Sequence, residues 1–354
     1  MIDTINIAVT ATSNSRLSQV DFNNIPFGKV YADHMFMADF KGGEWTDYQI
    51  LPYQNLSISP ANSAIHYGQS VFEGMKAYKN AKDEVLVFRP YDNLKRINKS
   101  ADRMCIPQIP SDLFMGGMTE LLRLDRAWVP KKAGTSLYIR PFVFATDEYI
   151  GIRPSDTYKF MIFTCPVGAY YSEPVKVKIE TEHARAIEGG TGYAKAAGNY
   201  AAALYPAKIA QQQGYHQLIW TDAKSHEYIE ESGTMNVMFM IGDTLITAPA
   251  GETILKGVTR DSVLTLAREW GIQVEERKVA VKEVINALKN DTLKEAFGTG
   301  TAATIANIAT IGYDGKDYQL PQTGETSFTA KVLRELEGIK SGNLSDPFNW
   351  VHKI

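Results

Sequence analysis

The sequence predicts a mixed α+β protein with two domains, and three observations support this. Its 354 residues are long enough for two domains, each with a sizeable core. Apolar strands and amphipathic helices follow one another without the regular strand–helix–strand order of a doubly wound sheet. A segment that contains Pro, Gly and Tyr at about 165–175 is typical of a linker. We therefore expect one domain at 1–172 and a second at 173–354.

The first half carries two expected helices among short apolar strands. Apolar residues recur at helical spacing over 94–104, and a second helix is predicted over 111–128 with Ser111 as its cap. Pro141 interrupts an apolar run, which predicts a bulge or a strand edge near Arg140. Strands are expected at 31–39, 85–88, 136–144 and 159–165.

The second half has a denser series of strands and helices. Gly214 is expected to end a helix that begins near Asn199, and Gly242-Asp243 is a hairpin signal. Strands are expected at 175–179, 218–220, 236–241 and 244–247. Helices are expected at 199–213, 255–270, 281–288 and 331–339.

Composition and charge exclude several classes of function. The formal net charge of −3 carries no long run of either sign, which argues against nucleic acid or an anionic membrane as a partner. No apolar run approaches the roughly 18 residues of a membrane span, and residues 1–27 lack a signal-peptide pattern. Cys105 and Cys165 indicate no disulfide framework, and the six histidines form no metal pattern. We expect a cytoplasmic protein without a metal.

One lysine stands in an unusual setting at Gly189–Tyr200. Lys195 is surrounded there by glycines and alanines, so its backbone can approach other groups closely. Few polar neighbours favour the neutral amine that a Schiff base with pyridoxal phosphate requires. A glycine-rich turn with an incidental surface lysine is the alternative.

Phosphate has three candidate positions. Gly257-Val258-Thr259-Arg260 opens a predicted helix, whose free N–H groups attract anions. Gly298–Thr301 offers a second nest of N–H groups and hydroxyls, and Arg89 at a strand end adds a charge. An ordinary helix cap would explain the first position equally well, and no Walker pattern is present.

An acid and an arginine complete the candidate chemistry. Glu231 precedes a Gly-Thr turn, where it could face a pyridine nitrogen or be a surface acid. Tyr138 and Arg140 alternate onto one face of a strand. Arg140 needs a partner in this apolar strand, either an internal acid or a carboxylate substrate.

Together these segments resemble the branched-chain amino acid aminotransferases, which are class IV, fold-type IV pyridoxal-phosphate enzymes. The resemblance covers most of the chain from about residue 30. It implies a small N-terminal α/β domain, a larger C-terminal domain with a pseudo-barrel sheet, and the cofactor at their interface. The matching motifs, in order, are H-Y-G-Q-S-V-F-E-G-M-K-A, F-R-P, A-G-T-S-L-Y-I-R-P, C-P-V-G-A-Y, G-Y-A-K-A-A-G-N-Y, E-S-G-T-M-N, G-V-T-R and F-G-T-G-T-A.

The resemblance also implies a role for each matching residue. Lys195 matches the Schiff-base lysine, Glu231 the acid at the pyridine nitrogen, and Tyr200 the tyrosine at the phenolic oxygen. Arg185 matches an arginine whose role stays open. The phosphate-binding positions are Arg89, Val258, Thr259 and Thr301. The substrate-binding positions are Tyr67, Phe72, Tyr138, Arg140, Tyr170, Thr301 and Ala302.

The implied reaction passes the amino group of leucine, isoleucine or valine to 2-oxoglutarate, giving glutamate and a branched 2-oxo acid. The family is homodimeric, so a homodimer is expected. A D-amino acid aminotransferase or an aminodeoxychorismate lyase of the same fold stays an alternative, although Tyr138 and Arg140 favour the branched-chain reading. Intact Lys195 and Glu231 disfavour a non-enzymatic binding protein. Ala303-Thr304-Ile305-Ala306 stands where mammalian members carry a Cys-x-x-Cys redox switch, so thiol regulation is not expected.

Overall fold

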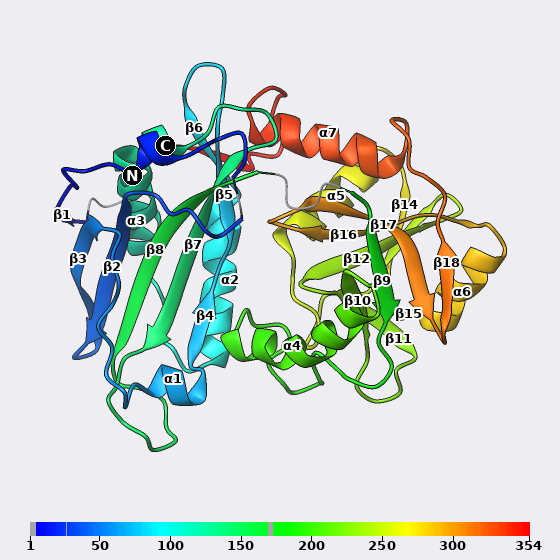
Figure 1. Ribbon diagram of the computed structural model, residues 1–354, viewed down its shortest axis with the longest axis horizontal. Helices are drawn as coiled ribbons and strands as arrows, with labels where there is room; N and C mark the ends of the chain where they lie inside the picture. Colours follow the sequence, from blue (N-terminus) through cyan, green and yellow to red (C-terminus); the bar gives the residue numbers. More distant parts are fainter. Residues whose placement is uncertain (1–4, 26, 169–172) are drawn as a thin grey trace. The chain divides into compact units, whose positions relative to one another are not determined.

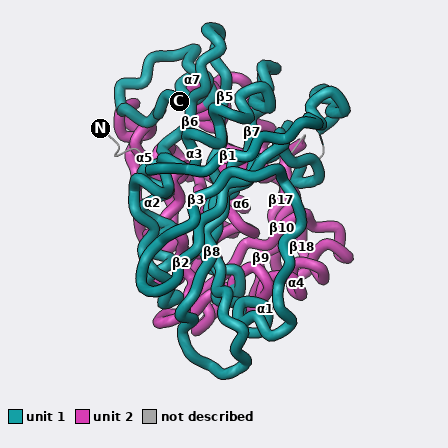
Figure 2. The backbone as a smooth tube through the Cα atoms, turned by 90° about the vertical axis from the view of Figure 1, so that its left-hand side faces the viewer, with its two compact units in different colours: residues 1–170, 194–198, 337–354 teal, residues 171–193, 199–336 magenta. Residues whose placement is uncertain are grey.

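The computed structural model describes residues 5–25, 27–168 and 173–354 of the chain (Figure 1). Contacts divide it into two compact units, coloured separately in Figure 2. Unit 1 takes residues 1–170, 194–198 and 337–354, and unit 2 takes 171–193 and 199–336. Residues 194–198 and 337–354 thus belong to the first unit, so a single boundary in the sequence does not separate the two units. The domain division near residue 172 stays a prediction.

Unit 1 contains a nine-stranded sheet, with α3 packed against β2 and β3. The strand order is β1-β3-β2-β8-β7-β5-β6-β19, and β4 pairs with β7. The strands are β1 (Ala8–Val9), β2 (His34–Lys41), β3 (Glu44–Pro52), β4 (Ser70–Phe72), β5 (Met75–Lys79), β6 (Val85–Phe88), β7 (Ser136–Ala145), β8 (Tyr158–Val167) and β19 (Val351–Lys353). The helices are α1 (Ser63–Tyr67), α2 (Pro90–Arg103) and α3 (Ser111–Leu124), with short 3-10 turns η1 (Leu17–Gln19) and η2 (Arg126–Trp128).

The predicted bulge near Arg140 is wrong. β7 pairs with β8 in unbroken register through both Arg140 and Pro141. On its other side β7 changes partner at this point, from β5 to β4. Pro141 lies in the gap between the two partners, where its missing N–H costs no ladder hydrogen bond, and its carbonyl accepts the N–H of Glu73 at 2.7 Å. Glu73 and Gly74, the two residues between β4 and β5, lie opposite this gap.

Unit 2 is built on a ten-stranded sheet that closes on itself. The order is β14-β13-β12-β16-β17-β9-β10-β11-β15, and a further pairing of β11 with β12 closes six of these strands into a ring. The strands are β9 (Val175–Ile179), β10 (Gln217–Thr221), β11 (Tyr228–Ser232), β12 (Met235–Ile241), β13 (Thr244–Thr247), β14 (Gln273–Glu276), β15 (Val279–Ala280), β16 (Leu293–Gly300), β17 (Thr304–Tyr313) and β18 (Lys316–Gln319). The helices are α4 (Ala197–Gln212), α5 (Val258–Glu269), α6 (Val281–Lys289) and α7 (Phe328–Lys340).

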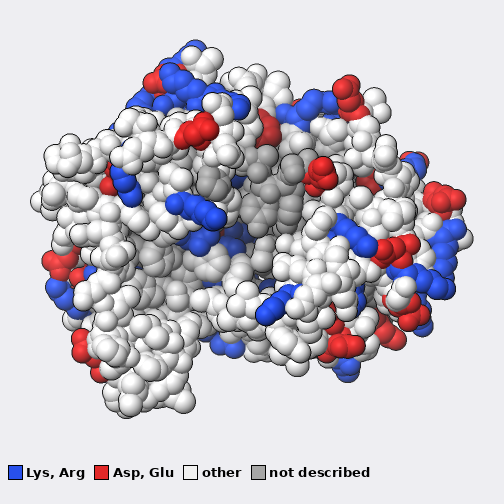
Figure 3. Space-filling view, in the orientation of Figure 1, with Lys and Arg blue, Asp and Glu red and all other residues white. Residues whose placement is uncertain are grey.

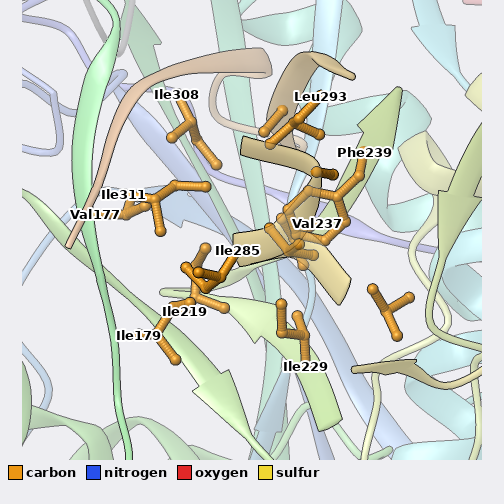
Figure 4. Close-up of a cluster of buried hydrophobic side chains, with 14 of the residues drawn as sticks. Val177, Ile179, Ile219, Ile229, Val237, Phe239, Ile285, Leu293, Ile308 and Ile311 are labelled. Carbon is orange, nitrogen blue, oxygen red and sulfur yellow. The ribbon is translucent and has the colours of Figure 1, made fainter. Parts of the chain in front are cut away.

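The core of unit 2 comes from apolar residues of the ring strands. Strand β9 alternates buried and half-buried residues, as a strand with one face inward should. Figure 4 shows these side chains pointing toward one another, with Ile285 of α6 added to them. The cluster includes Val177, Ile179, Ile219, Ile229, Val237, Phe239, Leu293, Ile308 and Ile311. The mixed α+β class with a closed pseudo-barrel sheet is therefore confirmed.

The boundaries of helices α3 and α5 differ from their predictions. Helix α3 begins at Ser111, but its N-cap is Pro110 and no side chain caps it, so Ser111 is not the cap. The helix ends at Leu124 because the chain tightens into η2 at 126–128. Helix α5 begins at Val258, three residues later than predicted, with Gly257 in extended conformation before it.

Four features bear on possible partners and ligands: surface charge, helix apolarity, clusters of metal-binding residue types and the cysteines. Figure 3 shows acidic and basic side chains interspersed over the region of β18 and α6. Within 5–25, 27–168 and 173–354, no helix combines the length and apolarity needed to cross a membrane. The same residues contain no cluster of His, Cys, Asp and Glu suited to a metal ion. Cys105 and Cys165 are both free.

Candidate active site

Lys195 lies in the segment Ala194–Gly198 of unit 1, which backbone contacts fix from both sides. Its N–H donates to Ser100 Oγ at 2.9 Å, and its carbonyl accepts the N–H of Phe72 at 3.1 Å. The residue that follows forms an isolated bridge with Val71. Helix α4 then begins at Ala197. The main chain that carries the lysine is therefore anchored to α2 and β4.

The ring of Phe72 brings the lysine and the arginine of unit 1 together. Lys195 Nζ lies 4.7 Å from the ring centroid, and Arg140 Cζ lies 4.7 Å from the same centroid. Arg140 Nη2 donates to the Tyr138 hydroxyl at 2.8 Å. Arg140 Nε is buried and has no hydrogen-bond partner among the described residues. A guanidinium with an unused buried donor suits a carboxylate ligand.

A buried ion pair beside this group was missed by sequence reasoning. Glu73 is fully buried, and Arg96 donates to both of its oxygens at 2.6 and 2.7 Å. Asn93 adds a hydrogen bond of 2.7 Å. Burial raises the pKa of Glu73, but Arg96, Asn93 and the charge of Lys195 outweigh it, so the pKa lies below its usual value. The only early signal was a glutamate inside an apolar, aromatic segment.

Two other predicted residues of unit 1 have contacts of their own. Arg89 has a left-handed φ of 50°, which is uncommon for a residue other than glycine, and it caps α2. Its Nε donates to Asp92 at 2.8 Å, and its guanidinium lies 5.3 Å from the Trp350 ring. Tyr67, at the end of α1, donates to the carbonyl of Ile150 and is 42% exposed.

Glu231 is the centre of the candidate site in unit 2. It is 3% exposed, on β11 directly opposite Asn236 of β12. Its Oε1 accepts the N–H of Leu255 at 2.7 Å and Asn236 Nδ2 at 3.2 Å. Its Oε2 lies 3.0 Å from Arg185 Nε. A surface turn acid is thereby excluded, since this carboxylate is buried and held at both oxygens.

The strand register continues this row to Thr299. Asn236 pairs with Glu231 on one side and with Thr299 of β16 on the other, so the three side chains share a face. Thr299 Oγ1 is buried without a hydrogen-bond partner among the described residues. A buried hydroxyl beside a buried carboxylate and an amide fits a polar heteroaromatic ligand such as the pyridoxal ring.

The N-terminus of α5 offers an anion site in the same unit. The helix starts at Val258 and Thr259, and its N-cap residue is Gly257, which has no side chain to cap it. A Cβ at Gly257 would collide with Asn236 Oδ1, so the chain approaches the Glu231 row closely only because residue 257 is glycine. The N–H groups in the first turn of a helix attract a phosphate.

The remaining predicted residues lie at turns and at a helix start. Tyr200 is half-buried in the first turn of α4, and Thr301 and Ala302 form the turn between β16 and β17. The start of α4 is steadied by Asn199, whose amide exchanges hydrogen bonds of 2.6 and 2.8 Å with Thr191. Tyr170 lies outside the described residues.

The chain matches the model of one protein family. That family is amino-transferase class IV, and the match runs over residues 70–311. The match spans most of the chain and includes the segments of Phe72, Lys195 and Glu231. The chain therefore belongs to the class IV aminotransferases.

Among proteins of known name, the chain is similar to branched-chain aminotransferases. "Branched-chain-amino-acid aminotransferase 2" of Bacillus subtilis (strain 168) is 44% identical over 99% of this chain and 97% of that protein. A solved branched-chain aminotransferase from Thermoproteus uzoniensis, with norvaline, has a TM-score of 0.75 at 25% identity, covering 90% and 99% of the two chains. Another from T.th., with pyridoxamine 5′-phosphate, has a TM-score of 0.75 at 24% identity over 92% and 99%, which concerns the fold alone.

Proposed function

We propose that this protein is a branched-chain L-amino acid aminotransferase, which passes the amino group of leucine, isoleucine or valine to 2-oxoglutarate and runs reversibly. Identity of 44% to a protein of that name over 99% of the chain supports the reaction. The choice of 2-oxoglutarate as amino-group acceptor rests on Arg140, whose buried Nε lacks a hydrogen-bond partner among the described residues and whose guanidinium lies against Phe72. An arginine in that setting suits the distal carboxylate of 2-oxoglutarate.

The cofactor is pyridoxal 5′-phosphate, which supplies an electron-withdrawing ring and a carbonyl that accepts the amino group. Lys195 would hold it covalently and then move the substrate's Cα proton with its Nζ atom. Glu231 would keep a proton on the pyridine nitrogen, and Tyr200 would donate to the phenolic oxygen. The phosphate would be bound by Arg89, Val258, Thr259 and Thr301. The buried Thr299 hydroxyl, the Glu231 carboxylate and the helix start at Val258 support this fit.

Recognition of two unlike side chains would use one pocket. Phe72 and Tyr138 supply apolar ring surface for a branched chain, and Arg140 with the Tyr138 hydroxyl supplies charge and a hydrogen bond for a carboxylate. Thr301 and Ala302 would receive the α-carboxylate, and Tyr67 and Tyr170 complete the proposed pocket. Leucine, isoleucine and valine should be separated only weakly, because one methylene is worth about 1–3 kcal/mol.

A substrate panel tests this function. L-leucine, D-alanine and aminodeoxychorismate are assayed with purified protein and the cofactor, and L-leucine with 2-oxoglutarate should be the productive pair. Activity confined to the other two substrates would replace the proposed function by one of its alternatives. Lys195→Ala should abolish turnover, and borohydride should leave the cofactor's mass on the peptide containing Lys195. Lys224→Ala, at an exposed lysine, is the matched control.

We propose that the protein is a homodimer. Exposed apolar side chains in unit 1 support this: Ile65 of α1 is 64% exposed, Ile150 is 67% exposed and Ile152 is 89% exposed. The hydrogen bond from Tyr67 to the Ile150 carbonyl places α1 beside the loop that carries the other two. Exposed apolar patches mark interaction surfaces. Sedimentation should give twice the 39.4 kDa chain mass, and Ile152→Asp should shift it toward that of one chain.

We also propose a cytoplasmic location. The two cysteines are unpaired although Cys105 is exposed, which fits a reducing compartment. Cell fractionation followed by immunodetection tests the location. Recovery with the periplasmic or extracellular fraction would contradict it.

A further inference from the structure

The Arg185 side chain is 9% exposed and lies inside unit 2, where it contacts three separate segments. Its Nε is 3.0 Å from Glu231 Oε2. Its Nη2 donates to the carbonyl of Thr253 and, at 3.3 Å, to the carbonyl of Gly192. One side chain therefore joins the buried acid to the loop before Lys195 and to the loop before α5.

We propose that Arg185 is a positioning residue that holds the Glu231 carboxylate ionised and oriented toward the pyridine nitrogen, and that couples this acid to both adjoining loops. The inference rests on the proposed function. It assigns a task to an arginine that does not itself belong to the proposed ligands of the cofactor.

The contacts of Glu231 explain why an arginine is needed. Oε1 is held by the Leu255 N–H and by Asn236, which are neutral donors. Arg185 is the cation paired with this carboxylate, and its guanidinium stays charged at every accessible pH. A buried carboxylate without a cation would tend to take up a proton, and a neutral acid cannot keep the pyridine nitrogen protonated.

The neighbouring acid provides an internal contrast. Glu230 is 8% exposed on the same strand, and its Oε2 has no hydrogen-bond partner among the described residues. Burial raises the pKa of Glu230, and a hydrogen bond with Thr253 and the charge of Arg185 do not reverse this. Glu230 and Glu231 are adjacent buried glutamates, and the direct ion pair with Arg185 goes to Glu231.

The two carbonyl contacts extend the effect beyond the acid. Gly192 lies three residues before Lys195, and a Cβ there would come within 2.5 Å of the Ala186 Cβ and 2.7 Å of the Thr253 carbonyl oxygen. The loops are therefore packed backbone against backbone at this point. Arg185 closes the contact by donating to a carbonyl on each side, so its loss would loosen both loops as well as the acid.

The experiment compares Arg185→Met and Arg185→Lys with Arg277→Met. Arg277 is the control arginine, because it also belongs to unit 2, pairs with a glutamate (Glu283, 2.6 Å) and donates to a backbone carbonyl (Lys278, 3.1 Å), but is not among the residues of the proposed cofactor site. Four quantities are measured: the urea midpoint without cofactor, the dissociation constant of pyridoxal phosphate, the absorption spectrum of the bound cofactor against pH, and kcat and KM for leucine.

Arg185→Met should lower kcat about 10- to 100-fold, because the Glu231 carboxylate loses its ion pair with Arg185, with KM for leucine nearly unchanged. Its cofactor spectrum should also shift and regain pH dependence in the neutral range, and Arg185→Lys should restore part of both. Arg277→Met should lower the urea midpoint and leave the spectrum as in wild type.

A purely structural role would give a different pattern. If Arg185→Met lowers the midpoint as Arg277→Met does while spectrum and kcat per bound cofactor stay at wild-type values, the inference is overturned. Should Arg185→Met not fold, Arg185→Lys decides by the same spectral criterion. Failure of the wild-type protein to bind pyridoxal phosphate or to deaminate leucine would instead overturn the proposed function.

Discussion

Lys195 and Arg140 lie against the same aromatic ring, each with its cationic group 4.7 Å from the centroid of Phe72. Amino and guanidinium groups favour the face of an aromatic ring, so contact with Phe72 stabilises both side chains. In the proposed function one of these groups moves a proton and the other selects the acceptor. In that function, Phe72 of β4 therefore contacts both the proton-transferring lysine and the arginine that recognises the acceptor.

Arg140→Met should separate the two halves of the reaction. KM for 2-oxoglutarate is expected to rise by about 10- to 100-fold, since a hydrogen bond to a charged group is worth about 1.5–3 kcal/mol. The half-reaction with leucine should change by less than about threefold, because its side chain needs no cation. Steady-state kinetics with each substrate varied separately measures this. Equal losses for both substrates would contradict the assignment of Arg140.

Gly74→Ala should displace Tyr138, whose hydroxyl is the hydrogen-bond partner of Arg140. A Cβ at residue 74 would collide with the Tyr138 hydroxyl and approach its Cζ to 2.9 Å. The ring must then move, which costs about 1–3 kcal/mol of unfolding free energy and breaks its hydrogen bond to Arg140. Urea unfolding and the KM for 2-oxoglutarate report the two effects. Gly134→Ala, where a Cβ meets nothing within 4 Å, controls for general loss of glycine, although its positive φ adds some strain.

The ion pair of Glu73 and Arg96 should be costly to break singly. Glu73→Gln breaks the ion pair between a fully buried carboxylate and an Arg96 side chain that is 11% exposed, and about 3–5 kcal/mol of unfolding free energy should be lost at pH 7. Because the pKa of Glu73 lies below 4.5, the wild-type contribution is present above that pH and is lost as pH falls through the folded-state value. The variant should therefore be less sensitive to acid. Denaturant titrations at pH 7 and pH 4 test this, and an unchanged pH dependence would refute it.

Lys76 should make the protein more stable as pH rises. Burial and the nearby charge of Lys340 lower the pKa of Lys76 from 10.5 to about 8, with Glu337 opposing. The unfolded chain thus binds the extra proton between these values, so stability should increase from pH 8 to 10.5. Lys76→Met should remove this slope and add at most about 3.5 kcal/mol at pH 7, by the conversion of about 1.4 kcal/mol per pKa unit.

The exposed Lys82 provides the control for that experiment. Lys82→Met alters the same net charge at the surface, so its pH profile should follow wild type. Thermal unfolding of the three proteins at pH 7, 8, 9 and 10 is sufficient. A variant at Lys76 whose midpoint keeps the wild-type slope would show that this amine is already solvated in the folded state.

The local sequence pattern was enough to predict those helices and strands whose apolar residues repeat with a clear period. The helix over 94–104 was predicted because its apolar face repeats, and α2 is observed at Pro90–Arg103. Strand β3 was largely missed because its buried residues do not alternate cleanly. Strand β19 was missed because only its pairing with β6, distant in the chain, makes three residues a strand. Such pairings depend on tertiary contacts that no local window contains.

The residues of the candidate site also fall into two groups: those predicted from local motifs and those whose contacts depend on the fold. Lys195 and Glu231 were proposed because their motifs are ordered along the chain. Asn236 lay inside a recognised motif, but its contact with Glu231 depends on the register of β11 with β12. Glu73 and Arg96 are 23 residues apart, and only the packing of α2 beside β4 joins them. Residues proposed to contact a ligand can be predicted from motifs, whereas the residues that hold them in place are identified only from the fold.

The return of the chain to its first sheet has a consequence for synthesis on the ribosome. β19 pairs with β6, and the N–H of Arg89 donates to the carbonyl of Trp350 at 2.7 Å. Domains usually fold as they emerge, the N-terminal one first. Here the edge of the first sheet stays open until residue 353 has been translated, so unit 1 is the last to be completed although it is the first to be made. A sheet edge that stays exposed for so long presents unpaired N–H and C=O groups, to which a chaperone would bind.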